Sequence, residues 1–266
     1  MKVTIIQTDI VWGKPQDNIL KADRLMDTQP GSDPYVLPEM WATGFATTPE
    51  DLAESESESE ALRWMQQQAR SRQCAVSGSL AVRLDDGSYR NRHYFATPDR
   101  LSYYDKHHLF SYGHEDSYYT PGNRHVVVEW GGVRMLLLTC YDMRFPLWAR
   151  YGVAGEYDLI VVVANWPETR QQAWRILTRA RAIENQCYLI GVNRVGDDVF
   201  CHYIGESLVC DAKGDTLLQC SSTEQAATVS LDFDALHRQR TRFRVLDERD
   251  ALKCSSASIR VHPCLY

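Results

Sequence analysis

The sequence predicts one α/β domain in which helices cover a mixed β-sheet. Short apolar runs alternate with longer amphipathic runs along the 266 residues, and several of the short runs are apolar on both faces, as in strands buried on two sides. No linker rich in Pro, Ser or Gly divides the chain, and no internal repeat is visible. With 44% hydrophobic and 24% charged residues, the composition is that of an ordinary globular protein.

Eight segments are predicted strands, because they are short, mainly apolar and bounded by turn residues. Gly131-Gly132 supplies the positive φ of a tight turn between two of them. A second hairpin is predicted around residues 211–215, between 207–210 and 216–220. The eight segments are residues 3–12, 35–38, 75–82, 93–97, 125–130, 133–139, 159–164 and 188–193.

Four helices are predicted between these strands, over residues 14–26, 55–72, 146–151 and 168–185. Pro15 suits the first turn of the first helix, because Pro lacks the N–H that would have no partner there. The second helix is expected to begin with a run of Ser and Glu, since acidic side chains interact favourably with the dipole at a helix N-terminus. We interpret this run as a solvated first turn.

Charge and cysteine content exclude several classes of protein. Twenty-nine Lys and Arg against 35 Asp and Glu give a net charge of −6, and no basic cluster predicts a surface for nucleic acid or anionic lipid. No apolar run reaches the roughly 18 residues of a membrane span. The eight cysteines include no Cys-x-x-Cys pair, which favours reduced thiols and a cytoplasmic location. We therefore expect a small-molecule partner or a second copy of the chain.

Two of the predicted strand ends carry a charged residue suited to catalysis. Glu39 follows the strand 35–38, and ligands of open α/β sheets bind at such ends; the alternative is a surface glutamate. Lys106 lies among aromatic and apolar residues, and a desolvated ammonium stabilises developing negative charge; the alternative is a solvent-facing lysine. The adjacent His107 and His108 suggest a base or a metal ligand, but no matching ligand spacing lies nearby, and we expect no metal.

Cys140 is the most informative of the candidate residues. It ends the apolar strand 133–139, and Pro146 follows after a short elbow, where we expect a first helical turn. This arrangement holds the thiol near a helix N-terminus, whose positive potential favours the thiolate. It also directs the Tyr141 N–H toward the atom that the sulfur would attack. A buried structural cysteine is the alternative, and we expect that role for Cys74, Cys187, Cys201, Cys210 and Cys220.

Together these motifs resemble the nitrilase superfamily of carbon–nitrogen hydrolases, from residue 3 to about residue 250. Leu-Pro-Glu-Met contains Glu39, Tyr-Asp-Lys-His-His-Leu-Phe contains Lys106, and Thr-Cys-Tyr-Asp-Met-Arg-Phe-Pro contains Cys140, in the order of the family's Glu-Lys-Cys triad. Residues 164–167 and 179–185 match two further stretches. The resemblance implies a four-layer α-β-β-α sandwich over residues 1–250 and a homodimer. The tail, residues 251–266, matches nothing in the family.

Within the superfamily, the chain resembles the omega-amidase (2-oxoglutaramate amidase) branch. The run from Glu39 to Phe45 and the segment 110–122 favour this branch over true nitrilases. Glu115 matches a second essential glutamate of the family, and Asp116 is the alternative if the loop register differs by one. The resemblance implies hydrolysis of a terminal amide, such as that of 2-oxoglutaramate or succinamate, without a cofactor. A carbamoylase, another small-amide hydrolase and a non-catalytic binding protein on this fold are the alternatives.

The resemblance also implies a role for each matched residue. Cys140 attacks the amide carbonyl to form a thioester, and Glu39 acts as general base and returns a proton to the leaving ammonia. Lys106 and the Tyr141 N–H stabilise the oxyanion, while Glu115 holds Lys106 in place. Because two carboxylates share one ammonium, one of them is a candidate for protonation in the resting site.

Substrate recognition is open at the level of sequence. Arg144 lies four residues after the nucleophile and is either a clamp for a substrate carboxylate or a structural ion-pair partner. Phe45, Tyr141, Asn165 and Trp166 are the other predicted substrate-binding residues, by their position in the motifs. Asn165 offers both a donor and an acceptor to a substrate.

Overall fold

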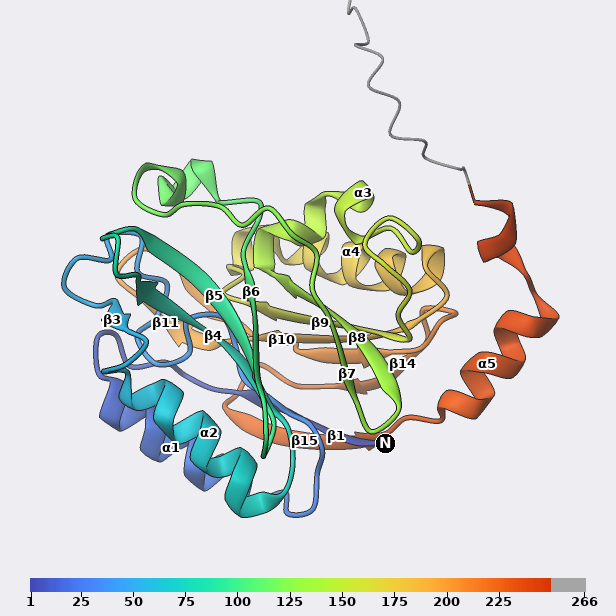
Figure 1. The fold of residues 1–266 in the computed structure, drawn as a ribbon, viewed down its shortest axis with the longest axis horizontal. Helices are drawn as coiled ribbons and strands as arrows, with labels where there is room; N and C mark the ends of the chain where they lie inside the picture. Colours follow the sequence, from blue (N-terminus) through green and yellow to red (C-terminus); the bar gives the residue numbers. More distant parts are fainter. Residues whose placement is uncertain (250–266) are drawn as a thin grey trace, which may run out of the picture.

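The computed structural model describes residues 1–249 and has two β-sheets stacked face to face between two layers of helices (Figure 1). The larger sheet has the order β15-β1-β2-β4-β5-β6, and β3 pairs with β4. Its strands are β1 (Lys2–Gln7), β2 (Tyr35–Val36), β3 (Glu54–Ser55), β4 (Val76–Arg83), β5 (Tyr89–Ala96), β6 (Leu101–Asp105) and β15 (Gln225–Ser230).

The second sheet has six strands in the order β14-β13-β10-β9-β8-β7. Its three central strands run parallel, so their carboxyl ends meet at one edge. A separate hairpin, β11 (Val195–Asp197) with β12 (His202–Ile204), follows β10. The strands of the second sheet are β7 (Val127–Trp130), β8 (Val133–Thr139), β9 (Leu159–Ala164), β10 (Tyr188–Asn193), β13 (Leu208–Cys210) and β14 (Thr216–Gln219).

Each sheet carries helices on its outer face (Figure 1). The larger sheet is covered by α1 (Pro15–Asp27) and α2 (Glu60–Arg72), and the second by α3 (Pro146–Ala149) and α4 (Gln171–Glu184). After β15 the chain continues into α5 (Phe233–Arg242). Short 3-10 helices are η1 (Ser111–Gly113), η2 (Glu115–Ser117), η3 (Cys140–Arg144), η4 (Glu168–Arg170) and η5 (Val245–Glu248).

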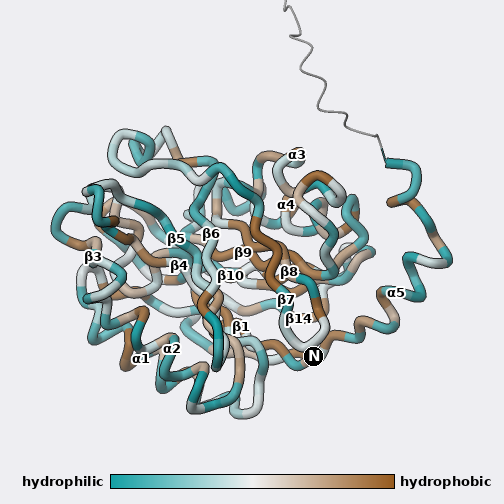
Figure 2. The backbone as a smooth tube through the Cα atoms, viewed as in Figure 1, coloured by the Kyte–Doolittle hydropathy of each residue, from teal (hydrophilic) through white to brown (hydrophobic). Residues whose placement is uncertain are grey.

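The central strands are apolar on both faces because each face packs against a different layer. In β9, Val161 and Val163 join the core between the two sheets, whereas Ile160 and Val162 pack toward the helices of the second sheet. Figure 2 shows the resulting hydrophobic band along β8, while much of α2 and α5 is hydrophilic. The period of two in the strands therefore gives each sheet two apolar faces, and three buried interfaces join the four layers.

The prediction of an α/β domain is confirmed, but the prediction of one mixed sheet is wrong. Two sheets share a core, as the family resemblance implied. The apolar pattern could not separate the two arrangements, because a strand between a sheet and a helix layer is buried on both faces, like a strand between two helix layers. The four-layer α-β-β-α sandwich is thus the observed architecture.

Several predicted boundaries are also corrected. The second helix was expected from residue 55 but begins at Glu60, because the Ser59 hydroxyl accepts a hydrogen bond from the Leu62 N–H at 3.1 Å and caps it. Residues Glu54–Ser55 instead pair with β4. The first strand ends at Gln7 rather than residue 12. Strands β3, β6, β11, β12 and β15 and helix α5 were not predicted.

Within residues 1–249, no helix is long and apolar enough to cross a bilayer. The tail predicted over 251–266 lies outside the described residues, so its boundary stays a prediction.

Candidate active site

Glu39, Lys106 and Glu115 form a charged cluster that is shielded from solvent. Glu39 follows β2, Lys106 follows β6, and Glu115 begins η2. The Lys106 Nζ donates to Glu39 Oε1 at 2.9 Å and to Glu115 Oε2 at 2.8 Å, and all three side chains are fully buried. Glu115, and not the alternative Asp116, therefore contacts the lysine. The surface alternatives weighed for Glu39 and Lys106 are wrong, because both carry paired charges in the interior.

Asn91 on β5 links the two carboxylates and was not predicted. Its Nδ2 donates to Glu39 Oε1 at 2.7 Å and to Glu115 Oε1 at 3.0 Å. Its Oδ1 accepts from the hydroxyl of Ser79, which fixes the amide orientation. A buried Asn within a polar strand sequence gives no signal of this role, because only the fold brings Asn91 to Glu39 across the intervening strand β4.

The cluster shifts the pKa values of its members in opposing ways. Burial by itself would lower the pKa of Lys106, but the carboxylates of Glu115 and Glu39 raise it well above its ordinary value. Burial raises the pKa of Glu115, against the effect of Lys106, and the Glu39 charge raises it further. Lys106 is therefore a fixed cation, and Glu115 is the carboxyl of the cluster that protonates more readily than an exposed glutamate.

Cys140 occupies a strained elbow at the carboxyl end of β8. Its φ of 45° lies in the left-handed region, which costs a residue with a side chain about 1–3 kcal/mol. The thiol is almost fully buried, 9% exposed, and its Sγ lies 3.9 Å from the carbonyl oxygen of Asn165. The predicted sequence of strand, elbow and helix is confirmed, with the 3-10 helix η3 placed between the strand and α3.

The expectation of a thiolate favoured by a helix N-terminus is not supported. Burial raises the pKa of the Cys140 thiol well above its ordinary value, and the nearby Glu39 carboxylate raises it further, while Lys106 lowers it only in part. Burial and the Glu39 charge therefore both favour the neutral thiol over the thiolate at Cys140. The one-turn α3 is too short, and too far along the chain behind η3, to outweigh the loss of hydration.

Two buried charged residues fix the elbow to neighbouring elements. Asp142 accepts hydrogen bonds from the Thr139 N–H at 3.0 Å, from the Tyr104 hydroxyl at 2.8 Å and from the His108 N–H at 2.9 Å. These bonds tie the elbow that carries Cys140 to the segment that carries Lys106. From α4, Arg181 donates to the carbonyl oxygen of Met143 at 2.7 Å.

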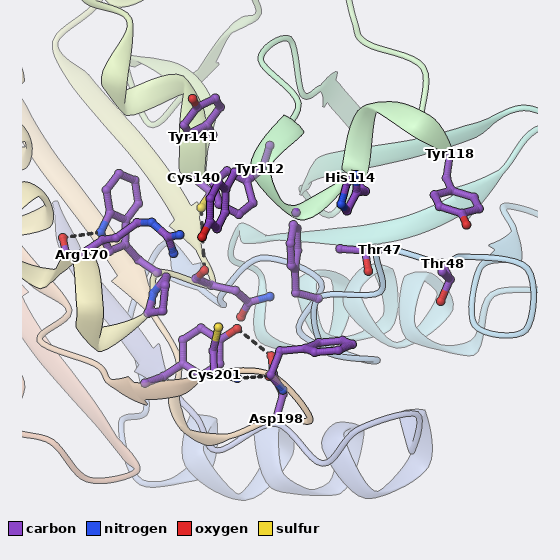
Figure 3. Close-up of a pocket in the computed structure, with 18 of the residues that line it drawn as sticks. Thr47, Thr48, Tyr112, His114, Tyr118, Cys140, Tyr141, Arg170, Asp198 and Cys201 are labelled. Carbon is purple, nitrogen blue, oxygen red and sulfur yellow. Dashed lines mark hydrogen bonds between the residues drawn. The ribbon is translucent and has the colours of Figure 1, made fainter.

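A cavity of about 520 Å³ opens above Cys140 (Figure 3). Its wall combines aromatic side chains with a few polar ones, the usual composition of a small-molecule site. Figure 3 shows residues from separate parts of the chain converging on it, with Cys140 and Tyr141 from the elbow and Cys201 from the β11–β12 hairpin. The lining residues include Phe45, Thr47, Thr48, Phe110, Tyr112, Gly113, His114, Tyr118, Cys140, Tyr141, Arg144, Asn165, Trp166, Pro167, Arg170, Asp198, Phe200, Cys201 and Tyr203.

All five predicted substrate-binding residues line this cavity. Asn165 is held by two hydrogen bonds to Glu39, from its N–H to Oε2 at 2.8 Å and from Nδ2 to the main-chain oxygen at 2.9 Å. Its Oδ1 is buried and has no partner among the described residues. Arg144 lies over the Trp166 ring at 5.0 Å and forms no ion pair within residues 1–249, so the ion-pair alternative for Arg144 finds no support.

Of the cysteines that were predicted to be buried, one is not. Cys74, Cys187, Cys210 and Cys220 are buried free thiols, as expected. Cys201 is only half-buried and lines the cavity, so the prediction of a core residue is wrong for it. Cys201 lies just before β12. The two strands of this hairpin are too short to show a strand pattern in the sequence. Cys254 and Cys264 lie outside the described residues.

His107 and His108 pack against aromatic rings. His107 stacks on Trp148 and His108 on Phe145, each with ring centroids 3.6 Å apart. His108 also contacts the Asp142 carboxylate through Nδ1 at 2.9 Å. Over the described part of the chain, no group of three or more His, Cys, Asp or Glu side chains is placed to hold a metal ion.

The fold and this cluster define a class of hydrolase, and sequence comparison identifies it. Residues 2–241 match the carbon-nitrogen hydrolase family, and the chain belongs to that family. It is 38% identical over 257 residues to omega-amidase YafV of Escherichia coli (strain K12), covering 95% of this chain and 98% of that protein. It is 33% identical over 254 residues to the 2-oxoglutaramate amidase of Bacillus subtilis (strain 168), covering 93% and 98%. The chain is therefore a carbon–nitrogen hydrolase that is similar to amidases.

Solved structures agree with the fold. XC1258 of Xanthomonas campestris, a carbon–nitrogen hydrolase superfamily protein with an arsenic adduct in its active site, superposes with a TM-score of 0.91 at 36% identity, covering 96% of this chain and 99% of that one. Nit3 of Saccharomyces cerevisiae, a member of the nitrilase superfamily, superposes with a TM-score of 0.82 at 22% identity, covering 91% and 94%. The four-layer sandwich is thus that of the nitrilase superfamily.

Proposed function

We propose that the protein is an amidase that hydrolyses the terminal amide of a small omega-amide, such as 2-oxoglutaramate or succinamate. One observation carries the proposal: the cavity that Cys140 lines, beside the buried Glu39–Lys106–Glu115 cluster, is also lined by Arg144, whose guanidinium has no carboxylate partner in the described residues. A nucleophile, a base and a free cation in one cavity suit an amide with an anionic far end. The names of the relatives at 33% and 38% identity support the same substrate class.

In the first step, Glu39 removes the proton from Cys140 as the sulfur attacks the amide carbonyl. A C–S bond forms, and the carbonyl π electrons move onto oxygen. An ammonium has three N–H donors, and the two carboxylates take two of those on Lys106. The third N–H and the Tyr141 N–H then stabilise the oxyanion, where one donor typically contributes about 3 kcal/mol.

In the second step, the C–N bond breaks and Glu39 returns the proton to the leaving nitrogen. Ammonia departs, and a thioester on Cys140 remains. The unpaired Oδ1 of Asn165 can accept a hydrogen bond from the amide nitrogen before it leaves. Glu39 next takes a proton from water, which attacks the thioester, and the C–S bond breaks as the thiol regains its proton. The products are a carboxylate and ammonia, and no cofactor enters the balance.

The guanidinium of Arg144 is the reason that we propose a substrate with an anionic end. Its planar fork can bind a carboxylate through two parallel hydrogen bonds, while the Trp166 ring supports its face. A charged hydrogen bond of this kind contributes about 1.5–3 kcal/mol. Arg144→Gln should therefore raise KM for succinamate by about 10- to 100-fold and leave kcat nearly unchanged.

Ammonia release across a panel of omega-amides, ureido acids and nitriles tests the proposed function. Wild type should prefer the omega-amides, and Cys140→Ala should release no ammonia while keeping its fold. Cys220→Ala, which removes a thiol outside the cavity, is the matched control and should stay active. Full activity in Cys140→Ala would contradict the nucleophile assignment. Preference for ureido acids would favour the carbamoylase alternative.

We also propose that the protein works as a homodimer in a reducing, cytoplasmic environment. Large apolar side chains on the outer helices of the second sheet are exposed, among them Leu147 at 58%, Ile176 at 55% and Ile183 at 49%. A second copy would remove them from water. Sedimentation of wild type should give twice the mass of one chain. Sedimentation of Ile176→Glu should give the mass of one chain. A reducing compartment keeps the Cys140 thiol available for attack.

A further inference from the structure

A second guanidinium, that of Arg170, lies in the same cavity and has no part in the steps above. It is half-buried, and its central carbon lies 5.1 Å from the ring centroid of Phe110 and 5.0 Å from that of Tyr112. Among residues 1–249 it forms no ion pair. The rings support the faces of the guanidinium and leave its N–H edges free to donate.

The charge of the cavity wall is unbalanced in favour of cations. The carboxylate that lines it is Asp198, whose Oδ1 accepts from the Phe200 and Cys201 N–H groups at 2.7 Å and whose Oδ2 accepts from the Tyr203 hydroxyl at 2.6 Å. Asp198 is therefore committed to holding its own loop. Arg144 and Arg170 face the cavity without such partners, although the whole chain carries a net charge of −6.

Arg170 immediately precedes α4, a helix of 14 residues whose first turn contains no acidic side chain. The carboxylate of Glu206 accepts from Gln171 Nε2 at 3.1 Å and from Arg175 Nε at 2.6 Å, so it is committed to the start of this helix and not to Arg170. An anionic ligand is therefore the chemistry that the two unpaired guanidiniums favour.

We propose that Arg170 is a second specificity-determining residue, which binds the anionic end of the substrate together with Arg144. Two forked donors present four N–H groups, enough to bind both oxygens of a carboxylate and a neighbouring acceptor at the same time. The preferred amides therefore carry a second acceptor beside the carboxylate, as a 2-oxo acid does. This inference rests on the proposed function, because it names the substrate class of the same cavity.

Calorimetric binding to the Cys140→Ala protein tests the inference without turnover. The probes are 2-oxoglutaramate, glutaramate, which lacks the 2-oxo group, and neutral pentanamide. When Arg170→Gln is added to the Cys140→Ala protein, the affinity for 2-oxoglutaramate should fall by about 10- to 100-fold and that for glutaramate by less. The affinity for pentanamide should fall by less than about 2-fold. Arg170→Lys should restore part of the affinity. Arg63→Gln, on the exposed surface of α2, is the matched control and should change none of them.

Two outcomes would overturn the inference. If Arg170→Gln lowers the affinity for all three probes equally, the residue only shapes the cavity wall. The same would follow if Tyr112→Ala, which removes a stacking ring but no charge, reproduced the selectivity of Arg170→Gln.

Failure of the proposed function gives a different result. In that case wild type releases no ammonia from any amide, yet Arg170→Gln still weakens the anionic probes selectively, and Arg170 remains an anion-binding residue. If wild type hydrolyses 2-oxoglutaramate and Arg170→Gln leaves its KM unchanged, the inference about Arg170 fails and the proposed function stands.

Discussion

The buried cluster and the outer wall of the cavity differ in how their charges are satisfied. In the cluster, each carboxylate oxygen of Glu39 and Glu115 accepts at least one hydrogen bond, and the lysine between them is fully buried. On the wall, Arg144 and Arg170 are half-buried and lie over aromatic rings without ion pairs in residues 1–249. The cluster is complete without a substrate, whereas the wall gains its counter-charge only when an anion binds.

Under the proposed function, this difference separates chemistry from recognition. A preorganised cluster would need no rearrangement when charge develops at the carbonyl, and it would suit any amide. Unpaired cations on the wall select among amides through differential binding. We therefore expect substitutions in the cluster to lower kcat and substitutions on the wall to raise KM.

The largest effect is expected from Lys106→Met, which removes the shared cation from two buried carboxylates. Breaking a buried charge pair typically costs 3–5 kcal/mol, so the free energy of unfolding should fall by about that amount at pH 8. Activity should fall by about 10³-fold or more, because the oxyanion loses its main donor as well. Urea unfolding and ammonia release measure the two effects.

The pH dependence of this loss has a definite sign. Without Lys106, the folded-state pKa of Glu115, which is already raised by burial, rises further. A carboxyl with a raised folded-state pKa contributes stability that is present below its unfolded pKa of about 4.3 and is lost as pH rises through the folded value. The difference in unfolding free energy between Lys106→Met and wild type should therefore be larger at pH 8 than at pH 5.5. An equal difference at both pH values would contradict the buried-pair assignment.

The next effect is expected from Glu39→Gln, which should lower kcat by about 10²- to 10³-fold yet make the thiol more acidic. Glu39 raises the pKa of Cys140, so neutralising it removes the second-largest cause of the shift after burial. The rate of Cys140 alkylation by iodoacetamide should then rise with pH from a lower midpoint than in wild type. Glu115→Gln is the matched control and should move the midpoint less, since its charge contributes least among the causes given. An unchanged midpoint in Glu39→Gln would contradict the contact between base and thiol.

A smaller effect is expected from Asn91→Ala, which removes the bridge between the two glutamates. Each carboxylate loses one donor but keeps Lys106, so kcat should fall by about 10- to 100-fold with KM unchanged. Ser79→Ala removes only the hydroxyl that orients the Asn91 amide, and it should lower kcat by less. A rise in KM without loss of kcat would place Asn91 in recognition instead of chemistry.

The sequence predicted the three triad residues and the five substrate-binding residues that meet in the structure, because each lies in or beside a short motif that resembles the family. Asn91, Asp198 and Arg170 were not predicted. Asn91 acts from the middle of a strand, and Asp198 belongs to a short hairpin. Arg170 follows a motif by only a few residues, and its role depends on rings that the chain supplies from elsewhere.

The state of the nucleophile could not be predicted from sequence either. The strand, elbow and helix pattern around Cys140 suggested a thiolate, but burial and the Glu39 charge decide its pKa. The Glu39 charge comes from 140 − 39 = 101 residues earlier in the chain, and the sulfur contacts Asn165, 25 residues later. The number of sheets could not be predicted for a related reason. Strands such as β9 are apolar on both faces whether the chain forms one mixed sheet or two stacked sheets.

The smallest effect is expected from Phe200→Ser on the outer wall. Phe200 lines the cavity but is 78% exposed, so it removes little apolar surface from water and forms no charged contact. KM for succinamate should change by less than about 3-fold and kcat not at all. Steady-state kinetics beside Arg144→Gln, which acts on the same wall through charge, provide the contrast. A fall in kcat for Phe200→Ser would break the division between cluster and wall, because an exposed ring far along the chain from the cluster would then be setting the chemistry.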